Sequence, residues 1–213
     1  MYLHGFASGP GSRKARFLRE RFAELGMALE TPDLAEGDFA HLTLTGQLRV
    51  IETVSRGEAV TLIGSSMGGY LAALYAARHP EVDKLVLLAP AFSFLARWPQ
   101  TLGAQAIDQW KHTGWLKVFH YADGRERELS YQLVEDARQY EAYPDCSQPA
   151  LVFHGRNDTV VPAEYSAAFV ERHPNATLRI LESGHELTDV LNDIWIETEP
   201  FLFQEAAGNP TRS

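Results

Sequence analysis

The sequence has few of the features that mark disulfide-rich, membrane-spanning or secreted proteins. Its single cysteine, Cys146, cannot form an internal disulfide and excludes a cysteine-rich zinc site. The longest apolar run, residues 85–96, is shorter than a membrane span and is interrupted by Pro90 and Ser93. The first residues hold neither a basic leader nor an apolar stretch long enough for a signal peptide. We therefore expect a cytoplasmic protein with no integral membrane segment.

Basic residues are also scarce. Lysine and arginine number 19 against 28 aspartate and glutamate residues, which leaves a net charge of -9. Nucleic acids and anionic membranes both bind basic surfaces, so neither is expected as the main partner. With 213 residues, 45% of them hydrophobic, the chain is long and apolar enough to bury a core. We expect one domain over residues 1–205, with an insertion at about 92–143 and a disordered tail at 206–213.

The apolar residues alternate between two patterns along the chain. Helical spacing predicts a first helix between the N-cap Ser12 and Gly26. Apolar runs and helical periods then predict a parallel sheet covered by helices on both faces, an α/β fold whose site lies at the carboxyl ends of the strands. The predicted strands are 1–3, 27–31, 59–63, 84–89, 150–153 and 177–181, and the later helices are 43–55, 67–78, 163–172 and 186–204.

The sharpest motif is Gly64-Ser65-Ser66-Met67-Gly68, a G-x-S-x-G sequence between a predicted strand and a predicted helix. Glycines at these two positions let a strand turn abruptly into a helix and hold the middle serine in a strained conformation with its hydroxyl exposed. Ser66 is therefore the candidate nucleophile. The alternative is a glycine-rich turn without a catalytic role.

A serine hydroxyl is a poor nucleophile unless a base takes its proton, and the base needs an acid to orient it. Asp158 and His185 each follow one of the last two predicted strands, so both lie at the carboxyl edge of the sheet. We predict Asp158 as the acid and His185 as the base, with a turn-forming aspartate and a structural histidine as the alternatives. Asp145 and Asp189 fit less well, because one precedes its strand and the other follows the histidine.

Hydrolysis through a serine also needs donors for the oxyanion of the tetrahedral intermediate. The backbone N–H of Met67, directly after the nucleophile, is one predicted donor. The turn after the first strand supplies the second, with the Phe6 N–H as first choice and Ala7 as the alternative. This turn could instead have only a structural role.

The insertion from Phe92 to Tyr143 is rich in aromatic residues. Residues 116–121 and 126–131 flank Asp123-Gly124, which predicts a hairpin with a type I′ turn, and residues 132–141 predict a helix. The insertion is either a surface excursion with its own small core or a lid over an apolar acyl chain, and the two can coexist. For the lid we expect Phe92, Trp98 and Trp110 to line the pocket, and replacing either tryptophan to shift acyl-chain preference.

Several segments between Tyr2 and Phe203 share one family pattern: Leu3-His4-Gly5-Phe6, Ser8, Pro10, Ser12, Lys14-Ala15, Pro32-Asp33-Leu34, Gly64 to Tyr70, the Asp158 loop and Ser183-Gly184-His185. Together they resemble small YqiA-type esterases of the α/β-hydrolase superfamily. The resemblance implies a compact α/β-hydrolase fold and a cytoplasmic bacterial hydrolase of carboxylic esters or thioesters. It also implies catalysis by Ser66, Asp158 and His185 without metal or organic cofactor. The chain departs from the wider superfamily by starting at what is ordinarily the third strand, which leaves a sheet edge less protected and the oligomeric state open.

Competing functions are weaker. Residues 5–14 do not match the G-x-x-x-x-G-K-[ST] phosphate loop, and Pro10 occupies one of its cradle positions. A metallohydrolase is disfavoured because no H-x-x-x-H or carboxylate-histidine cluster has ligand spacing. A non-catalytic scaffold that binds a small molecule stays open, as do an acyltransferase and a peptidase with the same three residues. The sequence therefore predicts a serine hydrolase acting on a small-molecule ester or thioester of small to medium acyl chain length.

Overall fold

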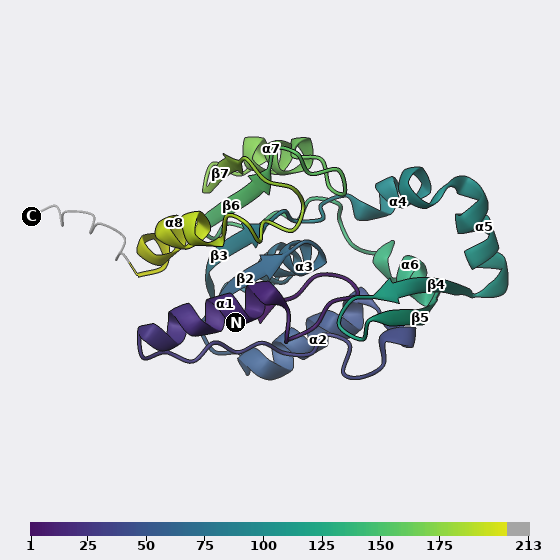
Figure 1. Cartoon of the computed structure of the whole chain (residues 1–213), viewed down its shortest axis with the longest axis horizontal. Coiled ribbons are helices and arrows are strands. Elements are labelled where there is room, and N and C mark those ends of the chain that lie inside the picture. The colour runs from purple at the N-terminus through teal and green to yellow at the C-terminus, as the bar shows by residue number, and fades with distance from the viewer. Residues whose placement is uncertain (204–213) are drawn as a thin grey trace, which may run out of the picture.

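A computed structural model describes residues 1–203 and contains a central five-stranded parallel sheet (Figure 1). All neighbouring strands run parallel, as predicted. The predicted tail at 206–213 lies outside the described residues. The strands lie side by side in the order β1 (Tyr2–Leu3), β2 (Val60–Ser65), β3 (Val82–Leu88), β6 (Ala150–Gly155) and β7 (Ala176–Leu181).

Helices cover both faces of this sheet. Alternate side chains of the strands belong to two separate cores: Ile63 and Val86 to one, Leu62 and Leu87 to the other. Because both faces are buried, the strands are apolar throughout rather than alternating with polar residues. The first core lies under α1 (Arg13–Glu24) and α8 (Leu191–Phe203), and the second under α2 (Leu44–Ser55), α3 (Met67–Ala76) and α7 (Glu164–Arg172). None of the described helices is both long and apolar enough to cross a membrane.

The segment 27–31, predicted as a strand, is not one. A single backbone hydrogen bond joins it to the sheet, from the Tyr2 N–H to the Glu30 carbonyl at 2.7 Å. β1 is only two residues long, and Pro32 directly follows segment 27–31, so the two segments cannot form a ladder of several hydrogen bonds. The segment still lies on the side of β1 away from β2. Segment 27–31 therefore follows β1 on one side and β2 lies on the other. At such a topological switch point a crevice opens at the carboxyl ends of the strands.

The insertion forms a cap at one end of the sheet (Figure 1). The predicted hairpin is confirmed, but its turn is not type I′. His120 pairs with Arg125, so the connection has four residues, of which only Gly124 has a positive φ. Two helices were not predicted, because Pro99 inside the first and Gly103 between them interrupt the helical pattern. The cap comprises α4 (Phe94–Leu102), α5 (Ala104–Thr113), β4 (Trp115–His120), β5 (Arg125–Ser130) and α6 (Gln132–Ala137), and a short 3₁₀ helix (Phe39–His41) packs against it.

Two helix ends matter for the site. α1 begins as predicted, because the Ser12 hydroxyl accepts a hydrogen bond from the Ala15 N–H at 3.3 Å. The last helix starts later than predicted, at Leu191 rather than near Glu186. Residues 186–190 instead prolong the loop that carries His185, and this loop lies against the start of α1.

Candidate active site

Ser66 occupies a strained turn between β2 and α3. Its backbone has φ 53° and ψ -117°, a conformation that residues with a side chain rarely adopt. A Cβ at Gly64 would collide with the backbone of Gly68, and a Cβ at Gly68 would collide with the backbone of Leu3. Both glycines are therefore required by close backbone approach, and together they leave the Ser66 hydroxyl at the mouth of the crevice.

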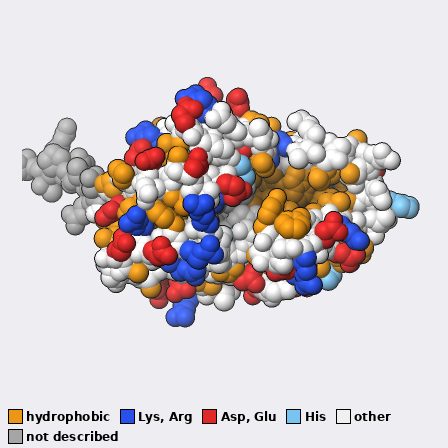
Figure 2. Space-filling view, viewed as in Figure 1, with side chains coloured by type: hydrophobic (Ala, Val, Ile, Leu, Met, Phe, Trp, Pro, Cys, Tyr) orange, Lys and Arg blue, Asp and Glu red, His pale blue; other side chains and the backbone are white. Residues whose placement is uncertain are grey.

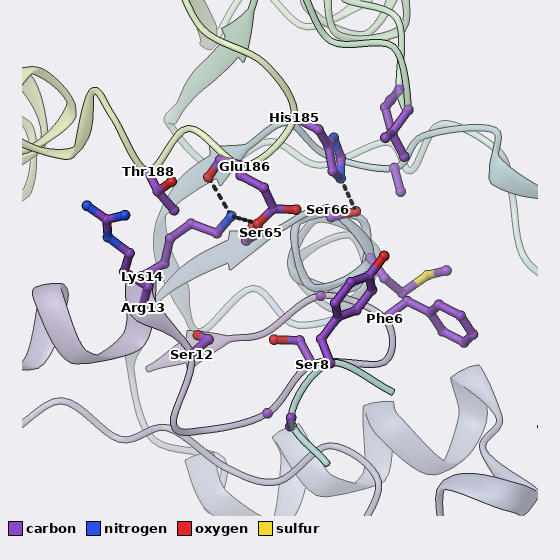
Figure 3. A pocket seen from close by; sticks show the side chains of 18 of the residues that line it. Phe6, Ser8, Ser12, Arg13, Lys14, Ser65, Ser66, His185, Glu186 and Thr188 are labelled. Carbon is purple, nitrogen blue, oxygen red and sulfur yellow. Dashed lines mark hydrogen bonds and ion pairs between the residues drawn. The ribbon is translucent and has the colours of Figure 1, made fainter. Parts of the chain in front are cut away.

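Three predicted side chains from separate loops meet here, and Figure 3 shows two of them, Ser66 and His185. The Ser66 Oγ lies 3.0 Å from His185 Nε2, although the two residues are 119 positions apart in the chain. The other ring nitrogen, His185 Nδ1, lies 2.7 Å from Asp158 Oδ2. Because the carboxylate accepts at Nδ1, the Nε2 atom of a neutral His185 is free to accept the serine proton.

The Asp158 carboxylate is held by four donors. Oδ1 accepts from the Val160 and Val161 N–H groups, both at 2.8 Å. Oδ2 accepts from His185 and lies 3.1 Å from His154 Nε2. Burial alone would raise the pKa of Asp158, but the hydrogen bonds from His154, His185 and Val161 outweigh burial and hold this pKa well below its ordinary value. The acid therefore stays ionised at neutral pH.

His154 is a site residue to which sequence reasoning assigned no role. Its side chain is fully buried at the end of β6, and its Nε2 lies 2.7 Å from the Val161 carbonyl as well as near Asp158. Both neighbours are acceptors, so Nε2 carries a proton, while Nδ1 lies 2.7 Å from the Ser166 hydroxyl. The available signal was its position four residues before Asp158, at the same strand end.

The predicted oxyanion donors lie beside the nucleophile. Gly5 places its backbone next to Ser66, since a Cβ there would lie 3.4 Å from the Ser66 Cβ. Within residues 1–203, neither the Phe6 N–H nor the Met67 N–H donates a hydrogen bond. Both groups are thus available to a ligand oxygen. The alternative donor, the Ala7 N–H, is equally unused in the described part of the chain, so the choice between Phe6 and Ala7 stays open.

A cavity of about 900 Å³ opens over Ser66. One side is apolar and lies under the cap, where the space-filling view shows a hollow lined by hydrophobic side chains (Figure 2). The other side is polar, and Figure 3 shows Arg13, Lys14 and Thr188 together to the left of Ser66. The apolar side includes Phe6, Met67, Phe94, Trp98 and Val161, and the polar side includes Ser8, Ser12, Arg13, Lys14 and Thr188.

Comparison with protein-family models shows the family to which this chain belongs. The model of an uncharacterised protein family, UPF0227, matches residues 1–198. The chain belongs to UPF0227. This is the YqiA-type family that the sequence motifs indicated.

Solved structures similar to this UPF0227 protein share the α/β-hydrolase fold. Mouse alpha/beta hydrolase domain-containing protein 10 is 18% identical, with a TM-score of 0.77 over 94% of this chain and 88% of that one. A monoacylglycerol lipase from Paleococcus ferrophilus is 19% identical, with a TM-score of 0.70 over 92% and 91%. Est1E from Butyrivibrio proteoclasticus, with ferulic acid bound, is 22% identical, with a TM-score of 0.67 over 92% and 87%. A search of curated proteins found no match.

Of the three aromatic residues expected in the pocket, the UPF0227 protein has only Trp98 on the cavity wall. Phe92 is fully buried and stacks on Phe169, with ring centroids 4.3 Å apart. Trp110 is also buried, and its indole N–H donates to the Leu129 carbonyl at 2.9 Å. The expectation for Phe92 and Trp110 is therefore corrected. The insertion has its own aromatic core and also contributes one wall of the cavity.

Lys14 connects α1 to the His185 loop. Its ammonium donates to the Glu186 carbonyl at 2.7 Å and lies 3.4 Å from the Glu186 carboxylate (Figure 3). The side chain is buried, and burial lowers the pKa of Lys14, although Glu186 partly offsets this. This contact restrains the residue directly after the predicted base.

Other reactive groups of the UPF0227 protein lie apart from this site. Burial raises the pKa of the Cys146 thiol to about 11, so this thiol is not a nucleophile at neutral pH. Among the described residues, Glu52, His79 and Glu81 bring three possible metal ligands within 4.8 Å of one another. That group lies near the C-terminal end of α3, whereas Ser66 directly precedes its N-terminal end.

Proposed function

We propose that this protein is a serine hydrolase that cleaves carboxylic esters, or acyl thioesters, of small to medium acyl chain length. The supporting observation is the continuous hydrogen-bond chain from Ser66 through His185 to Asp158, at the floor of a cavity with unused N–H donors. Structural similarity to a protein named as a monoacylglycerol lipase is consistent with this chemistry. The proposal needs no metal or organic cofactor.

In the first half-reaction, the Ser66 oxygen attacks the carbonyl carbon of the acyl group while its proton moves to His185 Nε2. The carbonyl oxygen becomes an oxyanion and accepts hydrogen bonds from the Met67 N–H and from the loop after β1. Asp158 stabilises the imidazolium that forms. When the carbonyl is restored, the bond to the leaving oxygen or sulfur breaks, and His185 donates its proton to the departing alcohol or thiol.

In the second half-reaction, water attacks the acyl group that is now bound to Ser66. His185 takes a proton from the water and returns it to the Ser66 oxygen as the acyl bond breaks, which releases the carboxylic acid. The apolar wall under the cap suits an acyl chain, because burying each methylene there is favourable by about 0.8 kcal/mol.

Labelling with a fluorophosphonate followed by peptide mapping tests this proposal. These reagents phosphonylate only a serine that is activated by a base. We expect the label on the peptide that contains Ser66, none on a Ser66→Ala variant, and full labelling of a Ser65→Ala control. Label on another residue, or on none in folded protein, would contradict the proposal, and the absence of label would favour a non-catalytic binding scaffold.

A transferase with the same residues would also take the label. It differs in the second half-reaction, where an alcohol or amine replaces water. Product analysis with a 4-nitrophenyl ester in buffer separates the two, because a hydrolase releases the free acid without an added acceptor. We expect the free acid and nitrophenolate in equal amounts.

A further inference from the structure

A buried arginine of the cap lines the same cavity as Ser66. Arg97 lies on α4 and is only 7% exposed. The one hydrogen bond that the Arg97 side chain makes to the described residues runs from Nη1 to the Val160 carbonyl at 2.5 Å. The Nε atom is buried and has no hydrogen-bond partner there. A guanidinium carries five N–H donors, so most of its hydrogen-bonding capacity is unused.

No carboxylate among residues 1–203 forms an ion pair with Arg97. Asp158 is close in sequence to Val160, but both of its oxygens already accept from other groups. The ring of Tyr165 lies 5.3 Å from the guanidinium carbon and covers one face only. Burying a cation without an ion-pair partner costs several kcal/mol, and a ligand carboxylate would supply the missing charge.

The unused donors have a defined geometry. Nε is buried, and Nη1 donates to the Val160 carbonyl. Nη2 makes no hydrogen bond to the described residues and is not buried, so a carboxylate in the cavity can accept from its N–H groups. A carboxylate that enters the cavity would therefore meet no competing acceptor from the protein.

The position of Arg97 indicates which part of the substrate carries this carboxylate. Arg97 belongs to the same wall as Phe94 and Trp98, the apolar side that the proposed function gives to the acyl chain. Arg13 and Lys14 lie on the other side of Ser66 (Figure 3). Because the whole chain has a net charge of -9, an anionic chain end needs a local cation to enter.

We propose that Arg97 binds a carboxylate at the far end of the acyl chain, so that the preferred substrates are monoesters or monothioesters of dicarboxylic acids. This inference rests on the proposed function, because it assigns the acyl side of the same cavity. Arg97 is then a specificity-determining residue that contacts substrate. The methylenes between the two carbonyl carbons lie against the apolar wall.

A pair of substrates with one leaving group tests it. 4-Nitrophenyl hydrogen glutarate carries the terminal carboxylate, and 4-nitrophenyl 5-methylhexanoate replaces that carboxylate with an uncharged isopropyl group of the same shape. We expect wild-type kcat/KM to favour the glutarate. In Arg97→Gln the ratio of the two kcat/KM values should fall about 10- to 100-fold, through loss on the glutarate alone.

The ratio is an internal control, because a partly unfolded variant loses both activities equally. Arg97→Lys keeps the charge but changes the length and shape of the donor group, and should give an intermediate ratio. Arg172→Gln removes an arginine that stacks on Tyr143 and does not line the cavity, and should leave the ratio unchanged. A wild-type enzyme without preference for the glutarate, or an Arg97→Gln variant with an unchanged ratio, would overturn the inference.

Two further outcomes separate the hypotheses. With 4-acetoxybenzoate and 4-isopropylphenyl acetate the carboxylate lies in the leaving group, and an Arg97-dependent preference there would overturn the assignment to the acyl side. A protein that takes the fluorophosphonate on Ser66 but treats the two chain-end esters equally keeps the proposed function and loses the Arg97 inference. A protein that neither labels nor hydrolyses any of these esters loses both.

Discussion

At the scale of single residues, the proposed reactivity of Ser66 requires residues without a side chain at positions 64 and 68. Gly64 and Gly68 approach other backbone segments too closely for any Cβ, and this approach allows the positive φ of Ser66. Asp158 and His154 then determine how the base is oriented. Substituting a residue that positions the three proposed reacting groups should therefore also lower activity or stability, although by less than removing the Ser66 hydroxyl.

Gly68→Ala should destabilise the protein by about 3 kcal/mol or prevent folding, because the new methyl group overlaps the backbone of Leu3. The matched control is Gly11→Ala, where nothing lies within 4 Å of the added Cβ and φ is not positive. We expect this control to change the free energy of unfolding by less than about 0.5 kcal/mol. Urea unfolding of both variants checks the difference, and equal stabilities would refute the packing argument.

His154→Phe should lower kcat by about 10- to 100-fold with little change in KM, since a small displacement of the acid misaligns the base. It also removes one of the interactions that lower the pKa of Asp158, and burial then raises that pKa. Asp158 would then protonate at a higher pH than in the wild type, so the loss of activity that comes from protonating this carboxylate begins at a higher pH. Ser166→Ala is the milder control. If the profile of His154→Phe matched the wild type, His154 would have only a packing role.

At the scale of helices and loops, two contacts link separate elements to the site. Lys14 of α1 holds the loop after His185, and the cap supplies Trp98 to the cavity wall. In both cases the residue acts where one element meets another, so its effect on activity and its effect on stability can differ. The two predictions at this scale use that difference.

Lys14→Met should lower kcat several-fold, because the Glu186 carbonyl loses its donor and the His185 loop is less restrained. The free energy of unfolding should change little, since methionine removes the cost of burying a charge while the Glu186 carboxylate stays exposed to water. Steady-state kinetics and thermal unfolding of the same preparation measure both quantities. A variant with full activity would show that this contact does not restrain the base.

Trp98→Ala should shift the acyl-chain preference towards bulkier chains, with a smaller effect on hydrolysis of a 4-nitrophenyl acetate standard, because the side chain lines the cavity. Trp110→Ala is the matched variant and should instead lose about 3 to 5 kcal/mol of stability, because its ring is fully buried in the cap. A chain-length series of 4-nitrophenyl esters and urea unfolding distinguish the two effects. If both tryptophans changed only stability, the cap would have no part in chain selection.

At the scale of the whole molecule, the candidate site lies at the topological switch point between β1 and β2. The loop after β1, the turn after β2 and the loops after β6 and β7 all end at one edge of the sheet, although His185 and Ser66 are 119 residues apart. The apolar strand runs and the G-x-S-x-G motif were sufficient to predict that these loops lie at the carboxyl edge of a parallel sheet. Both patterns depend on local backbone geometry, which the sequence shows directly.

Other features depend on long-range packing and could not be predicted. The segment 27–31 has the composition of a strand, but a two-residue neighbour offers it one hydrogen bond. Trp98 and Trp110 lie on the same insertion, and only the folded cap distinguishes the wall residue from the core residue. The partners of His154, Lys14 and Arg97 come from distant segments or depend on loop conformation, so periodicity carries no signal for them.

The central claim is that the Ser66 oxygen is the nucleophile, and the most direct measurement is kcat for 4-nitrophenyl ester hydrolysis by Ser66→Ala against the wild type. Removing the hydroxyl should lower kcat by about 10³- to 10⁶-fold, with the oxyanion donors alone giving the residual rate. A correctly folded Ser66→Ala protein that retained most of its ester hydrolysis would contradict the account.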